Sequence, residues 1–227
     1  FGVTTVPLNL TATALIALDI DLDWDAPTTN NGAAPTGYVI ERSTSESSGF
    51  TAIESNYTAG TDYTDDDAAL VGATTYYYKV YAINTYGTSA ASNTANAVAS
   101  DVPAQVTGLT ITSSATTNLI LDWTAPSAQG STITGYKVER STSEFSGFTT
   151  IAANEQDTDF TDAPLTSNTL YYYKVSAINA FGTGAPSSTT SAPPLPTAPA
   201  TLTLTVLTLA QESSQGAIQL DWTDPSG

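Results

Sequence analysis

The stretch Leu22-Asp23-Trp24-Asp25-Ala26-Pro27 decides the fold, because it returns as Leu121-Asp122-Trp123-Thr124-Ala125-Pro126 and as Leu220-Asp221-Trp222-Thr223-Asp224-Pro225. The tryptophans stand at positions 24, 123 and 222, a constant spacing of 99 residues. Solenoid repeats are only about 20 to 50 residues long, so this period indicates tandem domains. We expect complete domains at residues 7–100 and 101–193, a linker and an incomplete third domain at 194–227, and a linker remnant at 1–6.

Each domain has the pattern of an all-β unit, because Thr, Val, Ile and Tyr dominate and apolar residues alternate with polar ones. Before the first tryptophan, the apolar residues fall on one face of a strand and the acidic residues on the other. The inward set is Ile20, Leu22 and Trp24, and the outward set is Asp19, Asp21, Asp23 and Asp25. The second domain repeats the inward set as Leu119, Leu121 and Trp123. About seven strands around one core tryptophan predict an immunoglobulin-like β-sandwich.

Two longer stretches recur in the same order. Gly37-Tyr38-Val39-Ile40-Glu41-Arg42 matches Gly135-Tyr136-Lys137-Val138-Glu139-Arg140, and residues 76–84 match residues 171–179. With the Trp-x-x-Pro stretch, this ordered set resembles the fibronectin type III domain over essentially all of residues 7–193. The resemblance implies an all-β chain of tandem immunoglobulin-like sandwiches, two complete plus the first two strands of a third.

The resemblance also implies roles for aromatic residues of the core. The core tryptophans would be Trp24, Trp123 and Trp222, and the tyrosine-corner residues would be Tyr76 and Tyr171. Each corner phenol would hydrogen-bond backbone near the preceding leucine, Leu70 or Leu165. The adhesive tripeptide Arg-Gly-Asp is absent from the sequence, so integrin-type binding is not implied.

The third copy supplies only two strands, which cannot close a sandwich around Trp222. Two interpretations stay open. A longer chain continues the domain, or residues 201–223 complete a sheet in a neighbouring molecule. The first is favoured, because the stretch ends at an ordinary loop position.

Composition removes several classes of function. Twenty-two acidic residues against five basic ones give a net charge of −17, which argues against nucleic acid and anionic membranes as partners. There is no cysteine and no histidine, so disulfides, thiolate metal sites and the commonest general base are all missing. No apolar run is long enough to span a bilayer. We therefore expect no enzymatic activity and no catalytic residues.

Carboxylates gather in one loop of the first domain, at Asp62, Asp65, Asp66 and Asp67. Several carboxylates on a turn are the ligands that calcium prefers, so this loop is a candidate calcium site, and calcium is the one cofactor candidate. The second domain has Asp157, Asp159 and Asp162 in the corresponding region. Neither run has EF-hand spacing. The aspartate stripe at residues 19–25 favours an over-charged solvated face over a docking site for calcium or a basic partner.

The basic residues lie mostly on two strands that neighbour each other in this fold. Glu41 and Lys79 point outward by parity, as do Glu139 and Lys174, so we expect cross-strand ion pairs. Tyr77 and Tyr81 flank Lys79 on the same face. They are candidates for an aromatic platform that binds a sugar or a peptide, although strand tyrosines are commonly good sheet formers.

Two sequons are present, Asn9-Leu10-Thr11 and Asn56-Tyr57-Thr58. Either asparagine is a candidate for N-glycosylation if the chain is exported.

The close duplication favours a non-catalytic extracellular structural protein, a multidomain subunit or segment of a cell-surface layer, filament or fibre. Its partners would be other copies of itself or other surface proteins, at a cell or virion surface. The acidic, lysine-poor composition fits a prokaryote or its virus in salty water. Two alternatives stay open: an adhesion module that binds glycan or protein, and an accessory spacer of a secreted carbohydrate-active enzyme.

Overall fold

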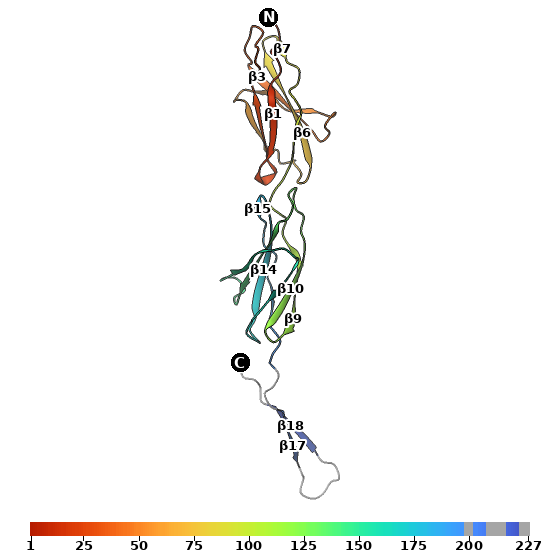
Figure 1. Cartoon of the computed structure of the whole chain (residues 1–227), viewed down its shortest axis with the longest axis vertical. Coiled ribbons are helices and arrows are strands. Elements are labelled where there is room, and N and C mark those ends of the chain that lie inside the picture. Colours follow the sequence, from red (N-terminus) through yellow and green to blue (C-terminus); the bar gives the residue numbers. More distant parts are fainter. Residues whose placement is uncertain (198–201, 208–216, 223–227) are drawn as a thin grey trace. The chain divides into compact units, whose positions relative to one another are not determined.

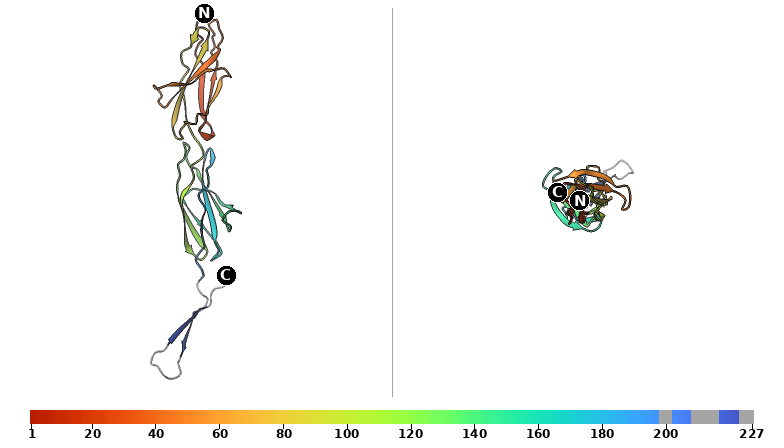
Figure 2. Two further views of the ribbon diagram at one scale, coloured as in Figure 1. Left: turned by 180° about the vertical axis from the view of Figure 1, so that it is seen from behind. Right: turned by 90° about the horizontal axis from the view of Figure 1, so that it is seen from above.

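The computed structural model describes residues 1–197 and the strand backbones at 202–207 and 217–222. Residues 7–193 form two β-sandwiches, called here the first and the second sandwich, and each has two layers of strands (Figures 1 and 2). The only helix among the described residues is the 3-10 turn η1 (Ile16–Leu18), and none there has the length and apolar character to cross a membrane. The predicted all-β class is therefore confirmed.

The first sandwich pairs a three-stranded sheet with a larger one. The smaller sheet has the order β1 (Leu8–Ala14), β2 (Ile20–Asp25), β5 (Asp62–Asp65). The larger sheet has the order β4 (Thr51–Tyr57), β3 (Gly37–Ser43), β6 (Thr75–Asn84), β7 (Gly87–Thr88), with β8 (Ala95–Val98) also on β6. All these pairs are antiparallel. Strands β3 and β6 thus lie side by side along their length.

The second sandwich repeats this topology strand for strand. Its smaller sheet has the order β13 (Asp159–Asp162), β10 (Asn118–Thr124), β9 (Thr107–Ala115). Its larger sheet has the order β12 (Thr149–Glu155), β11 (Gly135–Ser141), β14 (Tyr171–Asn179), β15 (Gly182–Thr183), with β16 (Thr190–Ala192) also on β14. The repeated sequence therefore gives the same topology in both copies.

The alternating pattern of the strands places the predicted apolar residues inside. Ile20 and Leu22 are fully buried, Trp24 is 4% exposed, and the second sandwich buries its counterparts Leu119, Leu121 and Trp123 equally well. Trp24 packs edge-to-face on Tyr38, with the ring centroids 5.2 Å apart. Burial of these side chains is the main favourable term in the stability of each sandwich.

Both predicted tyrosine corners are present. The Tyr76 hydroxyl accepts a hydrogen bond from the backbone N–H of Val71 at 3.0 Å, and the Tyr171 hydroxyl accepts one from Thr166 at 3.2 Å. Each donor directly follows the buried leucine of its sandwich, Leu70 or Leu165. The polar end of a buried ring is satisfied by local backbone in both copies.

Segments outside the two sandwiches also form regular contacts. In residues 1–6, the N–H of Gly2 donates to the carbonyl of Asn31 at 2.9 Å, and that of Thr5 donates to Thr29 at 3.0 Å. In the third copy, β17 (Leu202–Leu207) pairs antiparallel with β18 (Ala217–Trp222), so the two expected strands are present. The side chain of Trp222 lies outside the described residues.

Candidate functional site

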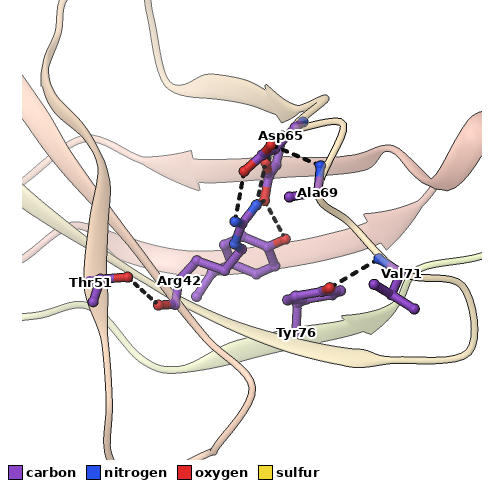
Figure 3. A network of polar contacts seen from close by, with 8 residues as sticks. Arg42, Thr51, Asp65, Ala69, Val71 and Tyr76 are labelled. Atoms are coloured by element: carbon purple, nitrogen blue, oxygen red, sulfur yellow. Dashed lines mark hydrogen bonds and ion pairs between the residues drawn. The ribbon is translucent and has the colours of Figure 1, made fainter.

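The acidic loop of the first sandwich surrounds an arginine. Asp65 ends β5 and is 2% exposed, and both of its carboxylate oxygens accept hydrogen bonds from Nη1 of Arg42 at 2.9 Å (Figure 3). Its Oδ2 also accepts a hydrogen bond from the Tyr78 hydroxyl at 2.7 Å. Asp65 belongs to the smaller sheet, whereas Arg42 on β3 and Tyr78 on β6 belong to the larger sheet. The three side chains therefore tie the two layers together, and we call this set the sheet clamp.

Asp67 adds a second carboxylate to the clamp. Its Oδ2 accepts from Nη2 of Arg42 at 2.8 Å, and its Oδ1 accepts from the backbone N–H of Ala69 at 3.0 Å. The bond from Ala69, followed by the bond from Arg42, lowers the pKa of the Asp67 carboxyl. The guanidinium of Arg42 also lies 5.4 Å from the centroid of the Tyr76 ring. The arginine thus contacts two carboxylates and one aromatic face.

The clamp changes the proton affinities of its members. Burial alone would lower the pKa of the Arg42 guanidinium, but its hydrogen bonds to Asp65 and Asp67 outweigh burial and raise it. Burial and the hydrogen bond to Asp65 raise the pKa of the Tyr78 hydroxyl well above its ordinary value. Both groups therefore keep their protons across the physiological range, and the arginine stays charged.

The structure gives two of the four aspartates of the predicted calcium site a different partner. Asp65 and Asp67 are bound to Arg42, whereas Asp62 and Asp66 are exposed. Within the described part of the chain, no three His, Cys, Asp or Glu side chains gather in a way that would hold a metal ion. The nearby arginine uses the carboxylate oxygens that a cation would need.

The second sandwich contains the same clamp. Both oxygens of Asp162 accept hydrogen bonds from Nη1 of Arg140 at 2.9 Å, and Tyr173 donates to Oδ2 at 2.7 Å. Burial and the bond to Asp162 raise the pKa of Tyr173. The other acidic residues of this region, Asp157 and Asp159, are exposed. The clamp was not predicted from the sequence, although the recurrence of an Arg, an Asp and a Tyr at matching positions was a usable signal.

The predicted cross-strand ion pair between Glu41 and Lys79 on the larger sheet is wrong, because each residue has another partner. Glu41 and Lys79 do lie directly opposite each other on β3 and β6. The ammonium of Lys79, however, lies over the Phe50 ring at 4.0 Å, and the Glu41 carboxylate accepts from the Tyr81 hydroxyl at 2.8 Å. In the second sandwich Lys174 lies over Phe148 at 4.1 Å, while Glu139 pairs with Lys137 at 3.1 Å. An aromatic face therefore replaces a carboxylate as the lysine's partner in both copies.

The two platform tyrosines are half-buried on this outer face of β6. Tyr77 lies opposite Ser43 and Tyr81 opposite Val39. Burial and the bond to Glu41 raise the pKa of Tyr81 to about 12. Since the Tyr81 hydroxyl donates to Glu41, these two side chains form a fixed surface with one aromatic and one acidic group. The second sandwich has Tyr172 and Ser176 at these positions, and Ser176 is buried.

The aspartate stripe lies on the smaller sheet of the first sandwich. Asp23 is directly opposite Asp62 on one side and Thr11 on the other. The second sandwich keeps the same row, with Asp122 opposite Asp159 and Thr110. Like charges directly opposite each other are destabilising, so screening by salt stabilises both rows.

The two sequon asparagines differ in their surroundings although both are exposed. The side-chain nitrogen of Asn9 donates to Oδ2 of Asp25 at 2.7 Å, and its φ is 52°. Asn56 lies near the end of β4, an edge strand, and a Cβ on Gly37 would overlap its amide oxygen.

The second sandwich matches a known domain family, and the chain resembles parts of longer proteins. Residues 104–193 match the family model of the fibronectin type III domain. The chain is 30% identical to Exoglucanase B of Cellulomonas fimi over 91% of its length, and 28% identical to titin of Drosophila melanogaster over 75%. It spans 19% of the exoglucanase and 1% of titin. A crystal structure of chicken CNTN1 FN1-FN3 domains is 18% identical, with a TM-score of 0.46 over 86% of this chain and 68% of that one.

Proposed function

Since residues 104–193 match the fibronectin type III domain and the first sandwich repeats their topology, we propose that the chain is a non-catalytic structural segment of an extracellular protein, built from tandem fibronectin type III domains. It would act as a subunit or segment of a cell-surface layer, filament or fibre, at a cell or virion surface. Its partners would be other copies of itself or other surface proteins. The mechanism is geometric, because each stiff sandwich adds a fixed length to the assembly.

The observation that carries this proposal is the duplicated sheet clamp. Both sandwiches use a partly buried arginine, a buried aspartate and a buried tyrosine to tie the two sheets, with the same distances in each copy. The chain has no cysteine, so no disulfide fulfils this role. Two domains with the same sheet clamp fit repeated spacers, because such domains need resistance to deformation rather than individual binding sites.

The basic residues support the same conclusion. The chain has five, and each contacts a carboxylate or an aromatic ring of its own sandwich. The remaining acidic excess keeps the surface soluble and charged. Recognition of an anionic ligand has little support, since it needs cations that these contacts already use.

Electron microscopy of the native material tests the proposal. We expect a regular filament, lattice or fibre in which sandwich-sized units repeat. Isolated chains that bind a glycan saturably, with binding lost in Tyr77→Ala or Tyr81→Ala, would instead establish the adhesion module.

A second function, the accessory spacer of a secreted carbohydrate-active enzyme, is favoured by one specific observation. The chain aligns over 91% of its length with a protein named Exoglucanase B, of which it spans 19%. Sequencing the reading frame beyond both ends of this chain separates the two functions. A catalytic domain in the same frame would establish the spacer, and further tandem sandwiches would establish the structural subunit.

A further inference from the structure

We propose that Asn56 is N-glycosylated and that the first sugar of its glycan occupies the hollow beside it. The inference rests on the export that the proposed function requires. It goes beyond that function, because it assigns a covalent modification and a sugar seat to the first sandwich.

The backbone around Asn56 departs from regular pairing. Tyr57 is opposite Tyr38, but Glu54 is opposite Ile40, so β4 contains one more residue than β3 over this interval. The N–H groups of Ser55 and Asn56 donate to Oε1 of Glu54 at 2.8 and 3.1 Å. Asn56 is exposed on this irregular stretch of an edge strand, so a modifying enzyme can reach it.

A hollow of about 250 Å³ lies beside Gly37, the residue that Asn56 approaches. The Asn56 amide oxygen lies so close to Gly37 that a Cβ on Gly37 would overlap it. Gly37 lines the hollow, and so does Thr58, the hydroxyl residue of the sequon. Other lining residues are Pro35, Thr36, Tyr38 and Thr61. Threonine hydroxyls offer hydrogen bonds, and the ring of Pro35 offers apolar contact, to one sugar ring.

Two other asparagines provide internal controls. Asn9 lies in a sequon, but its side-chain nitrogen, the atom that a sugar would join, donates to Asp25. Asn154 has the same position in β12 that Asn56 has in β4. The sequence there, Asn154-Glu155-Gln156, lacks the hydroxyl residue of a sequon. Of the three, only Asn56 combines a complete sequon with a side-chain amide that donates no hydrogen bond within the described part of the chain.

The chemistry is a group transfer without oxidation or reduction. The side-chain nitrogen of Asn56 forms a bond to the anomeric carbon of an oligosaccharide carried on a lipid phosphate. The bond from that carbon to the phosphate oxygen breaks, and the lipid phosphate leaves with the electron pair. The nitrogen loses one proton to the transferase, which the exporting cell supplies.

Mass spectrometry of tryptic peptides from the native chain tests the site. Cleavage after Arg42, Lys79, Arg140 and Lys174 puts Asn9, Asn56 and Asn154 on three separate peptides, 1–42, 43–79 and 141–174. We expect a glycan mass on peptide 43–79 and on neither of the other two, with Asn56 converted to aspartate when the glycan is removed by an amidase. An unmodified peptide 43–79 overturns the proposal.

Variants made in the producing organism sharpen the result. Thr58→Ala should abolish the modification and Thr58→Ser should keep it. Gln156→Thr completes a sequon at Asn154, which has a matching backbone position, and so compares the two sites directly. If Thr58→Ala remains modified at Asn56, the sequon assignment is wrong.

Hydrogen exchange tests the sugar seat. Removing the glycan should increase exchange in residues 57–61 and leave the matching region of the second sandwich unchanged. Equal exchange before and after removal would overturn the seat. An unmodified chain that still forms a filament would contradict this inference and leave the proposed function standing. A glycosylated chain without any ordered assembly would contradict the proposed function and leave this inference standing.

Discussion

The sheet clamps of the two sandwiches share three residues and nearly all of their distances, but they differ in how far they are enclosed. In the first, the side chains of Arg42 and Asp65 are 17% and 2% exposed. In the second, those of Arg140 and Asp162 are 30% and 8% exposed. The first clamp has Asp67 as an added partner, whereas the second has Pro164 two residues after its buried aspartate.

The difference separates what the fold requires from what one copy has added. The arginine Nη1 that both carboxylate oxygens share, the buried carboxylate and the tyrosine hydroxyl recur in both copies, so they belong to the closure of the two sheets. Asp67 occurs once, at the surface, and increases the enclosure of an arginine that is already paired. The predictions below test this division, beginning with the shared carboxylate.

Removing the buried aspartate should have the largest effect. Asp162→Ala leaves Arg140 and the buried Tyr173 hydroxyl without their carboxylate; breaking a fully buried pair costs about 3–5 kcal/mol of unfolding free energy, and this partly exposed pair should approach the lower end. Asp65→Ala should cost less, because Asp67 still pairs with Arg42. Urea unfolding measures the loss, and hydrogen exchange shows which sandwich opens.

A matched control comes from the same strands. Asp62→Ala and Asp159→Ala remove exposed aspartates that face like charges, so neither should lower the free energy of unfolding. If Asp65→Ala and Asp162→Ala were equally costly, Asp67 would contribute no compensation. A loss below about 1 kcal/mol in both would show that the clamp does not hold the sheets, because that is the range of exposed ion pairs.

Removing the tyrosine hydroxyl should have the next largest effect and should not distinguish the copies. Tyr78 and Tyr173 are fully buried, and each donates to a carboxylate at 2.7 Å. Tyr78→Phe and Tyr173→Phe should each cost about 1.5–3 kcal/mol, the range for a hydrogen bond to a charged group. A clear inequality in urea unfolding would mean that the two clamps are not equivalent.

The same tyrosines give a pH signature. Their pKa values are raised in the folded state, so the unfolded chain loses these protons first as the pH rises. Their contribution is complete below the ordinary tyrosine value of 10.0 and is lost above it. Stability should therefore fall above that pH, and less steeply in the two Phe variants.

The sequence predicted those features that depend on neighbours along one strand. Parity along β2 and β10 placed Trp24 and Trp123 inside, whereas the tyrosine corner at Tyr76 was implied by the resemblance to the fibronectin type III domain. The clamp escaped prediction because Arg42, Asp65 and Tyr78 lie on three strands of two sheets. Their contact depends on how the layers pack, which alternation within a strand does not specify.

The ion pair between Glu41 and Lys79 shows a second limit. The register was predicted correctly, yet a register fixes only Cα positions. Lysine has a long flexible side chain, and the Phe50 ring and the Tyr81 hydroxyl offered both residues other partners.

A double-mutant cycle distinguishes these partners and should show a smaller effect than either clamp substitution. Lys79 and Phe50 should couple by about 0.5–1 kcal/mol, the range for an exposed cation–π contact. Lys79 and Glu41 should show almost no coupling. The pair Lys174 and Phe148 should match the first pair, since the distances are 4.1 and 4.0 Å. Strong coupling between Lys79 and Glu41 in urea unfolding would show that the ion pair predicted from parity exists after all.

The smallest effect should come from Asp67, and its sign with pH identifies it. Asp67→Asn should lower stability slightly at neutral pH. It removes the charge of an exposed carboxylate that accepts hydrogen bonds from Ala69 and Arg42. The pKa of Asp67 is lower in the folded state, so the unfolded chain takes up this proton first as the pH falls. The contribution is therefore complete above the ordinary aspartate value of 3.8 and disappears as the pH falls through the folded-state value. The urea midpoints of wild type and Asp67→Asn should converge in acid. Midpoints that stay apart there would mean that Asp67 acts through packing rather than through its charge on Arg42.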